Sequence, residues 1–190
     1  MSLKDQKSED KKTENKEKTS AALELFGWAQ SLIWALLVLV LISSFFVRIS
    51  GVSGDSMYPT LHNFDRVLIR LNYDEPQRGD MVVVMAPHYD DEPLVKRIIG
   101  VAGDEIIVED GGDVWVNGEH MMETYINEQS FGSGSVSYPF YVPEGCVFVM
   151  GDNRNHSADS RMESIGALKV DDIIGRVCFR IWPLSSFGGM

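Results

Sequence analysis

A run of 23 residues without a charged side chain, Leu25–Val47, constrains the fold more than any other part of the chain. As an α-helix rising ~1.5 Å per residue it would span about 34 Å, enough for the ~30 Å hydrocarbon core of a bilayer. A buried core helix is rarely apolar on all sides over this length, and a cleaved signal peptide has a shorter apolar core. The sequence therefore predicts a transmembrane signal-anchor helix over residues 24–48.

The segments on either side of this helix differ in character. Residues 1–23 are mostly polar and charged, so we expect a disordered tail. The number of Lys and Arg residues near each end of a membrane helix predicts its orientation. The far side offers Arg48, with Arg66 at the limit of the range. The tail offers four lysines, Lys11, Lys12, Lys16 and Lys18. We therefore expect a cytoplasmic tail and an extracytoplasmic domain over residues 49–190.

The charge and cysteine content of residues 49–190 exclude several classes of function. This part has 10 Lys and Arg residues against 22 Asp and Glu residues, so a nucleic-acid partner is not expected. No metal-binding motif or cofactor motif is present, and we expect neither ligand. Cys146 and Cys178 each lie in an apolar run. They suit two small buried side chains, and a single disulfide between strands is the alternative.

The pattern beyond residue 61 predicts short β-strands rich in Val and Ile, separated by Gly, Asp and Pro. Residues 119–145 are polar, aromatic and rich in Gly and Ser, so we expect loops or loose strands there. The predicted fold is mainly β, with one transmembrane helix followed by an antiparallel β-rich domain. The expected strands are residues 66–71, 81–85, 94–101, 105–109, 114–116, 147–150 and 173–181.

The stretch after the predicted anchor, residues 51–61, is built like a turn that displays the hydroxyl of Ser56. Gly51 and Gly54 permit backbone conformations that other residues resist, and Pro59 fixes its own torsion. A loop that merely contains a serine is the simpler explanation. A catalytic role would require a base elsewhere in the chain.

Lysine and histidine are the candidate bases. Three of the four histidines, at positions 62, 88 and 120, lie in expected turns or loops, and His156 lies in a polar cluster. Lys96 lies in an apolar run, and in a strand it would point to the face opposite Arg97. Both side chains could extend to water at an edge. If Lys96 is buried instead, desolvation lowers its pKa and the neutral amine can accept the proton of Ser56.

Three stretches, taken together, resemble the conserved boxes of bacterial type I signal peptidases. They are Ser56–Leu61, Lys96–Gly100 and Gly151–Arg161, and their order and spacing also fit. Arg78–Val83 and the single preceding anchor extend the resemblance from about residue 25 to the end. Only 49 residues run from Arg97 to Gly145, so the chain resembles the short Gram-positive-like form.

The resemblance implies a serine endopeptidase with a Ser/Lys dyad. It makes Ser56 the nucleophile and Lys96 the general base, and it gives Ser157 the hydroxyl that orients the lysine. The backbone N–H of Ser56 would donate to the oxyanion. Some members place a serine two positions before the nucleophile, where this chain has Gly54, so the hole would lack that side-chain donor.

The resemblance also implies supporting residues. Asp159 and Arg161 would form a pair beside the dyad, while Asp152 and Arg154 would hold the loop. Two classes of protein compete with this interpretation. One is a self-cleaving Ser/Lys peptidase of related fold, and the other is a non-catalytic, membrane-tethered β-rich binding module.

The implied substrates are signal peptides of exported precursors, cut at a small-x-small site, with the lipid bilayer as second partner. An extended peptide could pair with an exposed strand edge and place alternate side chains in two pockets. Val52 and Val95, beside the nucleophile and the base, are the residues we expect to narrow these pockets.

Overall fold

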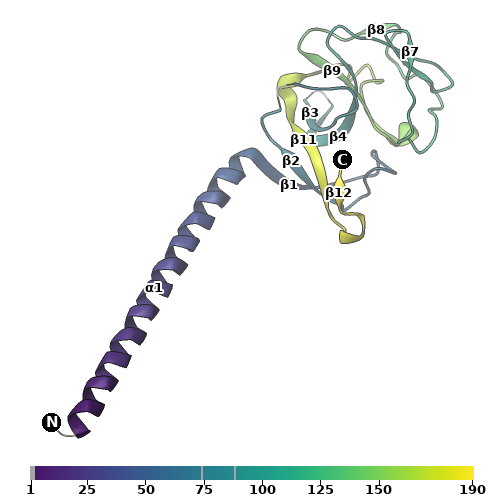
Figure 1. Ribbon diagram of the computed structural model, residues 1–190. Helices are drawn as coiled ribbons and strands as arrows, with labels where there is room; N and C mark the ends of the chain where they lie inside the picture. The colour runs from purple at the N-terminus through teal and green to yellow at the C-terminus, as the bar shows by residue number, and fades with distance from the viewer. Residues whose placement is uncertain (1–2, 74, 88) are drawn as a thin grey trace. The chain divides into compact units, whose positions relative to one another are not determined.

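The computed structural model describes residues 3–73, 75–87 and 89–190 and divides into two compact units, Met1–Phe45 and Phe46–Met190 (Figure 1). The first unit contains helix α1, Leu3–Phe46, apart from its last residue. The structure differs here from the disordered tail expected over residues 1–23, because the helix begins at Leu3; residues 1–2 lie outside the described range. No Gly or Pro interrupts residues 1–26, and the Lys, Glu and Gln residues of this segment favour helix.

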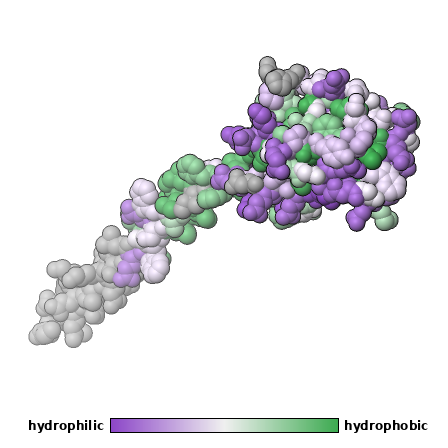
Figure 2. Space-filling view, turned by 90° about the horizontal axis from the view of Figure 1, so that it is seen from above, coloured by the Kyte–Doolittle hydropathy of each residue, from purple (hydrophilic) through white to green (hydrophobic). Residues whose placement is uncertain are grey.

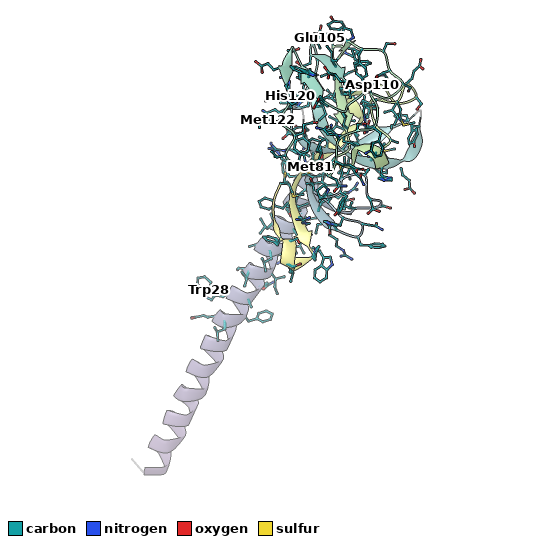
Figure 3. The ribbon with its side chains drawn as sticks, turned by 90° about the vertical axis from the view of Figure 1, so that its right-hand side faces the viewer. Trp28, Met81, Glu105, Asp110, His120 and Met122 are labelled. Carbon is teal, nitrogen blue, oxygen red and sulfur yellow. The ribbon has the colours of Figure 1, made fainter. Side chains whose placement is uncertain are left out.

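The apolar part of α1 covers Glu24–Phe46, and its length and composition suffice to cross a membrane. Figure 2 shows apolar side chains gathered along this part of the helix. They are exposed where the structure describes them, and the labelled Trp28 projects freely from the helix (Figure 3). A helix that is apolar on all sides and uncovered by protein suits hydrocarbon rather than water. The helix ends two residues before the predicted boundary at residue 48.

The second unit is β-rich, and all of its described strand pairs are antiparallel. The larger sheet has the order β1-β2-β11-β3-β4-β9-β10, with β12 paired to β11, and the smaller sheet has the order β7-β6-β5-β8. In Figure 1, β7 and β8 lie at one end of this unit and β12 at the other. The strands of the larger sheet are Val47–Gly51 (β1), Arg66–Arg70 (β2), Met81–Ala86 (β3), Asp90–Val101 (β4), Cys146–Met150 (β9), Leu168–Lys169 (β10), Ile173–Trp182 (β11) and Gly188–Gly189 (β12). Those of the smaller sheet are Glu105–Val108 (β5), Val114–Val116 (β6), Glu119–His120 (β7) and Phe140–Tyr141 (β8).

The antiparallel β-rich fold predicted from the sequence is confirmed, and each of the seven expected strands is present. Strand β1 was not expected, because its first residue was assigned to the apolar anchor run. It pairs with β2 over its whole length, from Val47 opposite Arg70 to Gly51 opposite Arg66. Residues 119–145 contain only the two-residue strands β7 and β8 and are otherwise irregular.

Strand β11 holds the larger sheet together. It lies between β2 and β3, which are not neighbours in the sheet. The apolar cluster beneath this region contains Val177 of β11, Met81 and Val83 of β3, and Val52 and Met57 from the turn that carries Ser56. The core of the sheet therefore continues directly into the candidate site.

Candidate active site

The turn that carries Ser56 follows β1 and is anchored by apolar side chains. Met57 and Leu61 are almost fully buried in the core. Gly54 has a φ of +83°, a left-handed conformation that favours glycine, and its N–H donates to the side chain of Asn63. Ser56 itself is half-buried, and it lines the groove described below.

Lys96 comes from the middle of β4 and meets Ser56 directly. Its Nζ lies 2.8 Å from the Ser56 hydroxyl oxygen, within hydrogen-bond distance. Only 2% of Lys96 is exposed. Burial is the largest influence on this amine and lowers its pKa to about 8, although the carboxylates of Asp159 and Asp152 act in the opposite direction. A useful fraction of Lys96 is therefore neutral near pH 7 and able to accept a proton.

Arg97 points to the opposite face of β4 and is also buried, so the alternative in which both cations extend to water is wrong. Its guanidinium binds both carboxylate oxygens of Asp152, at 2.8 and 2.6 Å, and donates to the carbonyl of Gly79. It also lies 4.1 Å from the centre of the Tyr125 ring. Sequence reasoning separated the two faces correctly but missed these partners, because Asp152 is 55 residues away in the chain.

Residues 151–153 bind the turn that carries Ser56 through three hydrogen bonds. The carboxylate of Asp152 accepts a hydrogen bond from the hydroxyl of Thr60. The Asn153 backbone N–H donates to the carbonyl of Ser56, and its side-chain amide donates to the carbonyl of Asp55, both at 3.0 Å. The role of Asn153 was not anticipated, although its place in the polar cluster was visible in the sequence.

Asp159 and Arg161 form a buried, two-pronged ion pair with both N–O distances at 2.8 Å. Asp159 also accepts the N–H of Gly151. Arg161 also donates to the Ser130 hydroxyl and to the Arg154 carbonyl, so the pair connects both ends of the 151–161 loop. This pairing matches the one that the family resemblance implies; its importance for activity stays a prediction.

Arg154 is buried against a partner from the irregular 119–145 segment. Its guanidinium binds both carboxylate oxygens of Glu123 and donates to the carbonyl of Gly151. No local pattern in the sequence marked Glu123, Tyr125 or Ser130 as partners of buried arginines. Residues 119–145, expected to be loops or loose strands, thus supply one partner for each of three arginines. The pairs are Tyr125 with Arg97, Glu123 with Arg154 and Ser130 with Arg161.

Ser157 lies close to the Ser56 turn but does not make the expected bond to Lys96 in this structure. Its hydroxyl is buried without a hydrogen-bond partner among the described residues. It lies close to Gly151, where an added Cβ would come within 2.2 Å of the Ser157 Oγ and 2.5 Å of the Ser56 carbonyl oxygen. The 151–161 loop therefore reaches Ser56 only because residue 151 has no side chain.

A groove of about 340 Å³ runs past Ser56 and Lys96. Its walls are residues 50–53, at the end of β1 and just after it, and residues 92–95 of β4, and both Val52 and Val95 line it. Strand β9 pairs with β4 only from Arg97 onward, so no strand covers the second edge of residues 94–96. The groove is thus open to an extended chain next to the hydroxyl.

The described histidines do not serve Ser56. His62 packs edge-on against Tyr58, His120 contacts the carboxylate of Asp113 at 3.3 Å, and His156 is exposed. In Figure 3, His120 lies with Met122 on the outside of the β-rich unit. His88 lies outside the described residues. Within the described chain no group of His, Cys, Asp or Glu residues could hold a metal ion, and Cys146 and Cys178 are free thiols.

Comparison with known proteins identifies the class. The family model described as signal peptidase, peptidase S26, matches residues 25–182. Signal peptidase I S of Bacillus subtilis (strain 168) is 35% identical over 92% of this chain and 96% of its own length. Signal peptidase IB of Staphylococcus aureus (strain Mu50 / ATCC 700699) is 33% identical over 86% of this chain and 93% of its own. A crystal structure of a signal peptidase I from Enterococcus faecalis V583 is 28% identical, covers 55% of this chain and 98% of that chain, and gives a TM-score of 0.47.

These matches make the protein a peptidase. The chain belongs to the signal peptidase family, peptidase S26, and its function is the removal of signal peptides.

Proposed function

We propose that this chain is a membrane-anchored serine endopeptidase that uses Ser56 as nucleophile and Lys96 as general base. The observation that carries the proposal is the 2.8 Å contact between the Ser56 hydroxyl and a lysine that is 2% exposed. An exposed lysine ammonium has no lone pair to accept a proton, whereas a buried amine with a lowered pKa does. The substrates are N-terminal signal peptides of exported precursors.

The reaction follows from the positions of these groups. The Ser56 oxygen attacks the scissile carbonyl carbon while its proton moves to Lys96 Nζ. The carbonyl oxygen becomes an oxyanion facing the backbone N–H of Ser56. The ammonium of Lys96 returns the proton to the leaving amine as the C–N bond breaks, which leaves an ester on Ser56. Water then attacks the ester while Lys96 takes its proton. The bond between the acyl carbon and the Ser56 oxygen breaks, the signal peptide leaves with a free carboxyl end, and Lys96 returns the proton to the Ser56 oxygen.

The groove supports cleavage after a small-x-small sequence. An extended peptide lying along residues 94–96 would place alternate side chains on the same side. Val52 and Val95 line the groove beside Ser56 and Lys96. In this proposal their branched side chains admit only small residues at the first and third positions before the cut.

The bilayer is the second proposed partner. Besides the apolar part of α1, the β1-β2-β11 region exposes apolar side chains: Ile49 is 59% exposed, Phe179 43% and Phe187 62%, and the two phenylalanine rings stack. Leu68 of β2 pairs with Ile49 of β1 on one side and with Phe179 of β11 on the other. The same side of β2 also exposes Arg66 and Arg70. Exposed apolar side chains flanked by arginines suit the surface of a bilayer. The lysines of the tail favour a cytoplasmic N-terminus and an extracytoplasmic β-rich unit.

The decisive test uses two full-length variants, Ser56→Ala and Lys96→Ala, assayed on a precursor with a small-x-small site in detergent or vesicles. Cleavage should be lost in both. The matched control is Lys169→Ala, because Lys169 is exposed and is the other lysine beyond the tail. Retained cleavage by either active-site variant would overturn the dyad, and a non-catalytic binding module predicts no cleavage even by the unaltered protein.

A further inference from the structure

We infer that Asn153 is a positioning residue that orients the oxyanion-binding N–H of Ser56. The inference rests on the proposed function, because it concerns the peptide group that would hold the oxyanion. The evidence is the hydrogen bond from the Asn153 side-chain amide to the carbonyl oxygen of Asp55, at 3.0 Å, which supplements the bond that this oxygen accepts from the Tyr58 N–H within the turn. That carbonyl belongs to the same peptide group as the Ser56 N–H.

Because a peptide group is planar, a contact that fixes its C=O also fixes the direction of its N–H. The Asp55–Ser56 bond is not among the cis peptide bonds of the described chain, and in a trans peptide the C=O and N–H point in opposite directions. Holding the Asp55 oxygen toward Asn153 therefore turns the Ser56 N–H away from Asn153. Within the described chain this N–H donates no hydrogen bond, so it is available to a ligand.

Asn153 also fixes the next peptide group. Its own backbone N–H donates to the Ser56 carbonyl oxygen at 3.0 Å. One residue thus holds the peptides on both sides of Ser56 and limits rotation about the backbone bonds of the nucleophile. Asn153 is 6% exposed, and its neighbours Asp152 and Arg154 are held by buried ion pairs to Arg97 and Glu123. The backbone on both sides of Asn153 is therefore held in place.

The glycine at position 54 makes the hydrogen bonds of Asn153 more important for this site. Gly54 supplies no side-chain donor for the oxyanion, and a glycine before the nucleophile leaves the turn freer to rotate. Preorganised donors stabilise a transition state because they need no reorganisation as charge develops. A hydrogen bond to the C=O of a peptide also polarises its N–H, which strengthens the bond that this N–H donates.

The test removes the Asn153 amide without adding charge. Asn153→Ala and the volume-conserving Asn153→Leu should each lower kcat by about 10- to 100-fold, less than or similar to the loss of a whole oxyanion donor. KM should stay within about threefold, because the substrate groove is untouched. The control is Asn155→Ala, which removes side-chain bonds to Glu128 and Gln129 from the same loop and should keep near-normal kcat. Asn153→Leu keeps the assay informative if the alanine variant does not fold.

A second readout separates positioning from general loosening. A peptide aldehyde adds to the Ser56 hydroxyl and places its former carbonyl oxygen where the oxyanion forms. Its affinity should fall in parallel with kcat, while an uncleavable amide analogue of the same sequence should bind unchanged. The pH at which activity is half-maximal should also stay at the wild-type value, because Lys96 remains buried.

Each contrary result has a distinct meaning. Normal kcat in a folded Asn153→Leu protein would overturn the inference, and so would equal losses in affinity for the aldehyde and the amide analogue. A shifted pH profile would show that the variant acts through Lys96 instead. If Ser56→Ala still cleaved the precursor, the proposed dyad itself would fail, whatever Asn153 does.

Discussion

Replacing Lys96 by methionine should stabilise the protein while abolishing its activity. The charged amine pays a desolvation penalty that an apolar side chain of similar length avoids. The drop in pKa from an ordinary 10.5 to about 8 corresponds to about 3 kcal/mol, at ~1.4 kcal/mol per tenfold change. Loss of the hydrogen bond to Ser56 offsets about 1 kcal/mol of this. We expect the free energy of unfolding of Lys96→Met to exceed that of wild type by about 2 kcal/mol at pH 7.

The pH dependence of this difference has a definite sign. Between about pH 8 and 10.5 the unfolded chain still holds the Lys96 proton that the folded chain has released. The unfolded state therefore binds more protons, and wild-type stability rises with pH across this window. The penalty is complete below about pH 8 and vanishes above about pH 10.5. The advantage of Lys96→Met should shrink accordingly as the pH is raised.

The measurement is urea unfolding of the full-length proteins in one detergent, followed by tryptophan fluorescence at pH 7 and pH 10. Lys169→Met is the matched control, and because Lys169 is exposed it should stay within about 0.5 kcal/mol of wild type. A Lys96→Met protein less stable than wild type at pH 7, or an advantage that does not change with pH, would refute the reasoning.

Three further results should follow from the site. Cleavage measured as kcat/KM should rise about tenfold per pH unit below pH 8 and level off above it, because the base Lys96 must be neutral to act; a flat profile between pH 6 and 8 would argue against this base. Val52→Leu and Val95→Leu should reduce cleavage of precursors with the larger accepted residues at the first and third positions before the cut, and an unchanged profile over a substrate panel would exclude them as pocket residues. Asp152→Ala leaves the buried guanidinium of Arg97 unpaired and should lower the free energy of unfolding by about 3–5 kcal/mol, measured by denaturant titration; a loss below 1 kcal/mol would show that water replaces the carboxylate.

The sequence was sufficient to predict the fold class, because an uncharged run marks the helix and alternating Val and Ile mark the strands. The family resemblance singled out Ser56 and Lys96, and the structure brings these two side chains within 2.8 Å of each other. The burial of Lys96 did not follow from its own strand, where extension to water was an open alternative. The structure differed where the environment comes from distant residues. Burial of Arg97 could not be predicted from its own strand, since Asp152 and Tyr125 cover it from other segments.

The hydrogen-bond partners of the 151–161 loop could not be predicted from the sequence either. Its residue types were recognisable, but their partners were not: Arg154 pairs with Glu123, and Ser130 accepts from Arg161. The hydroxyl of Ser157 was expected on Lys96, yet it lies buried without a partner in the described chain. Hydrogen bonds of this kind depend on side-chain orientations of a few ångströms, which residue spacing does not determine.

The position of β11 has a consequence for the order in which the candidate site is assembled. Ser56 follows β1 in one half of the larger sheet and Lys96 lies on β4 in the other half, and β11 joins the two halves. Strand β11, Ile173–Trp182, comes after both halves in the chain. Before β11 pairs with β2 and β3, the strands that carry Ser56 and Lys96 belong to separate hairpins. The 2.8 Å contact between the two side chains therefore depends on a strand that is more than 70 residues away from either of them.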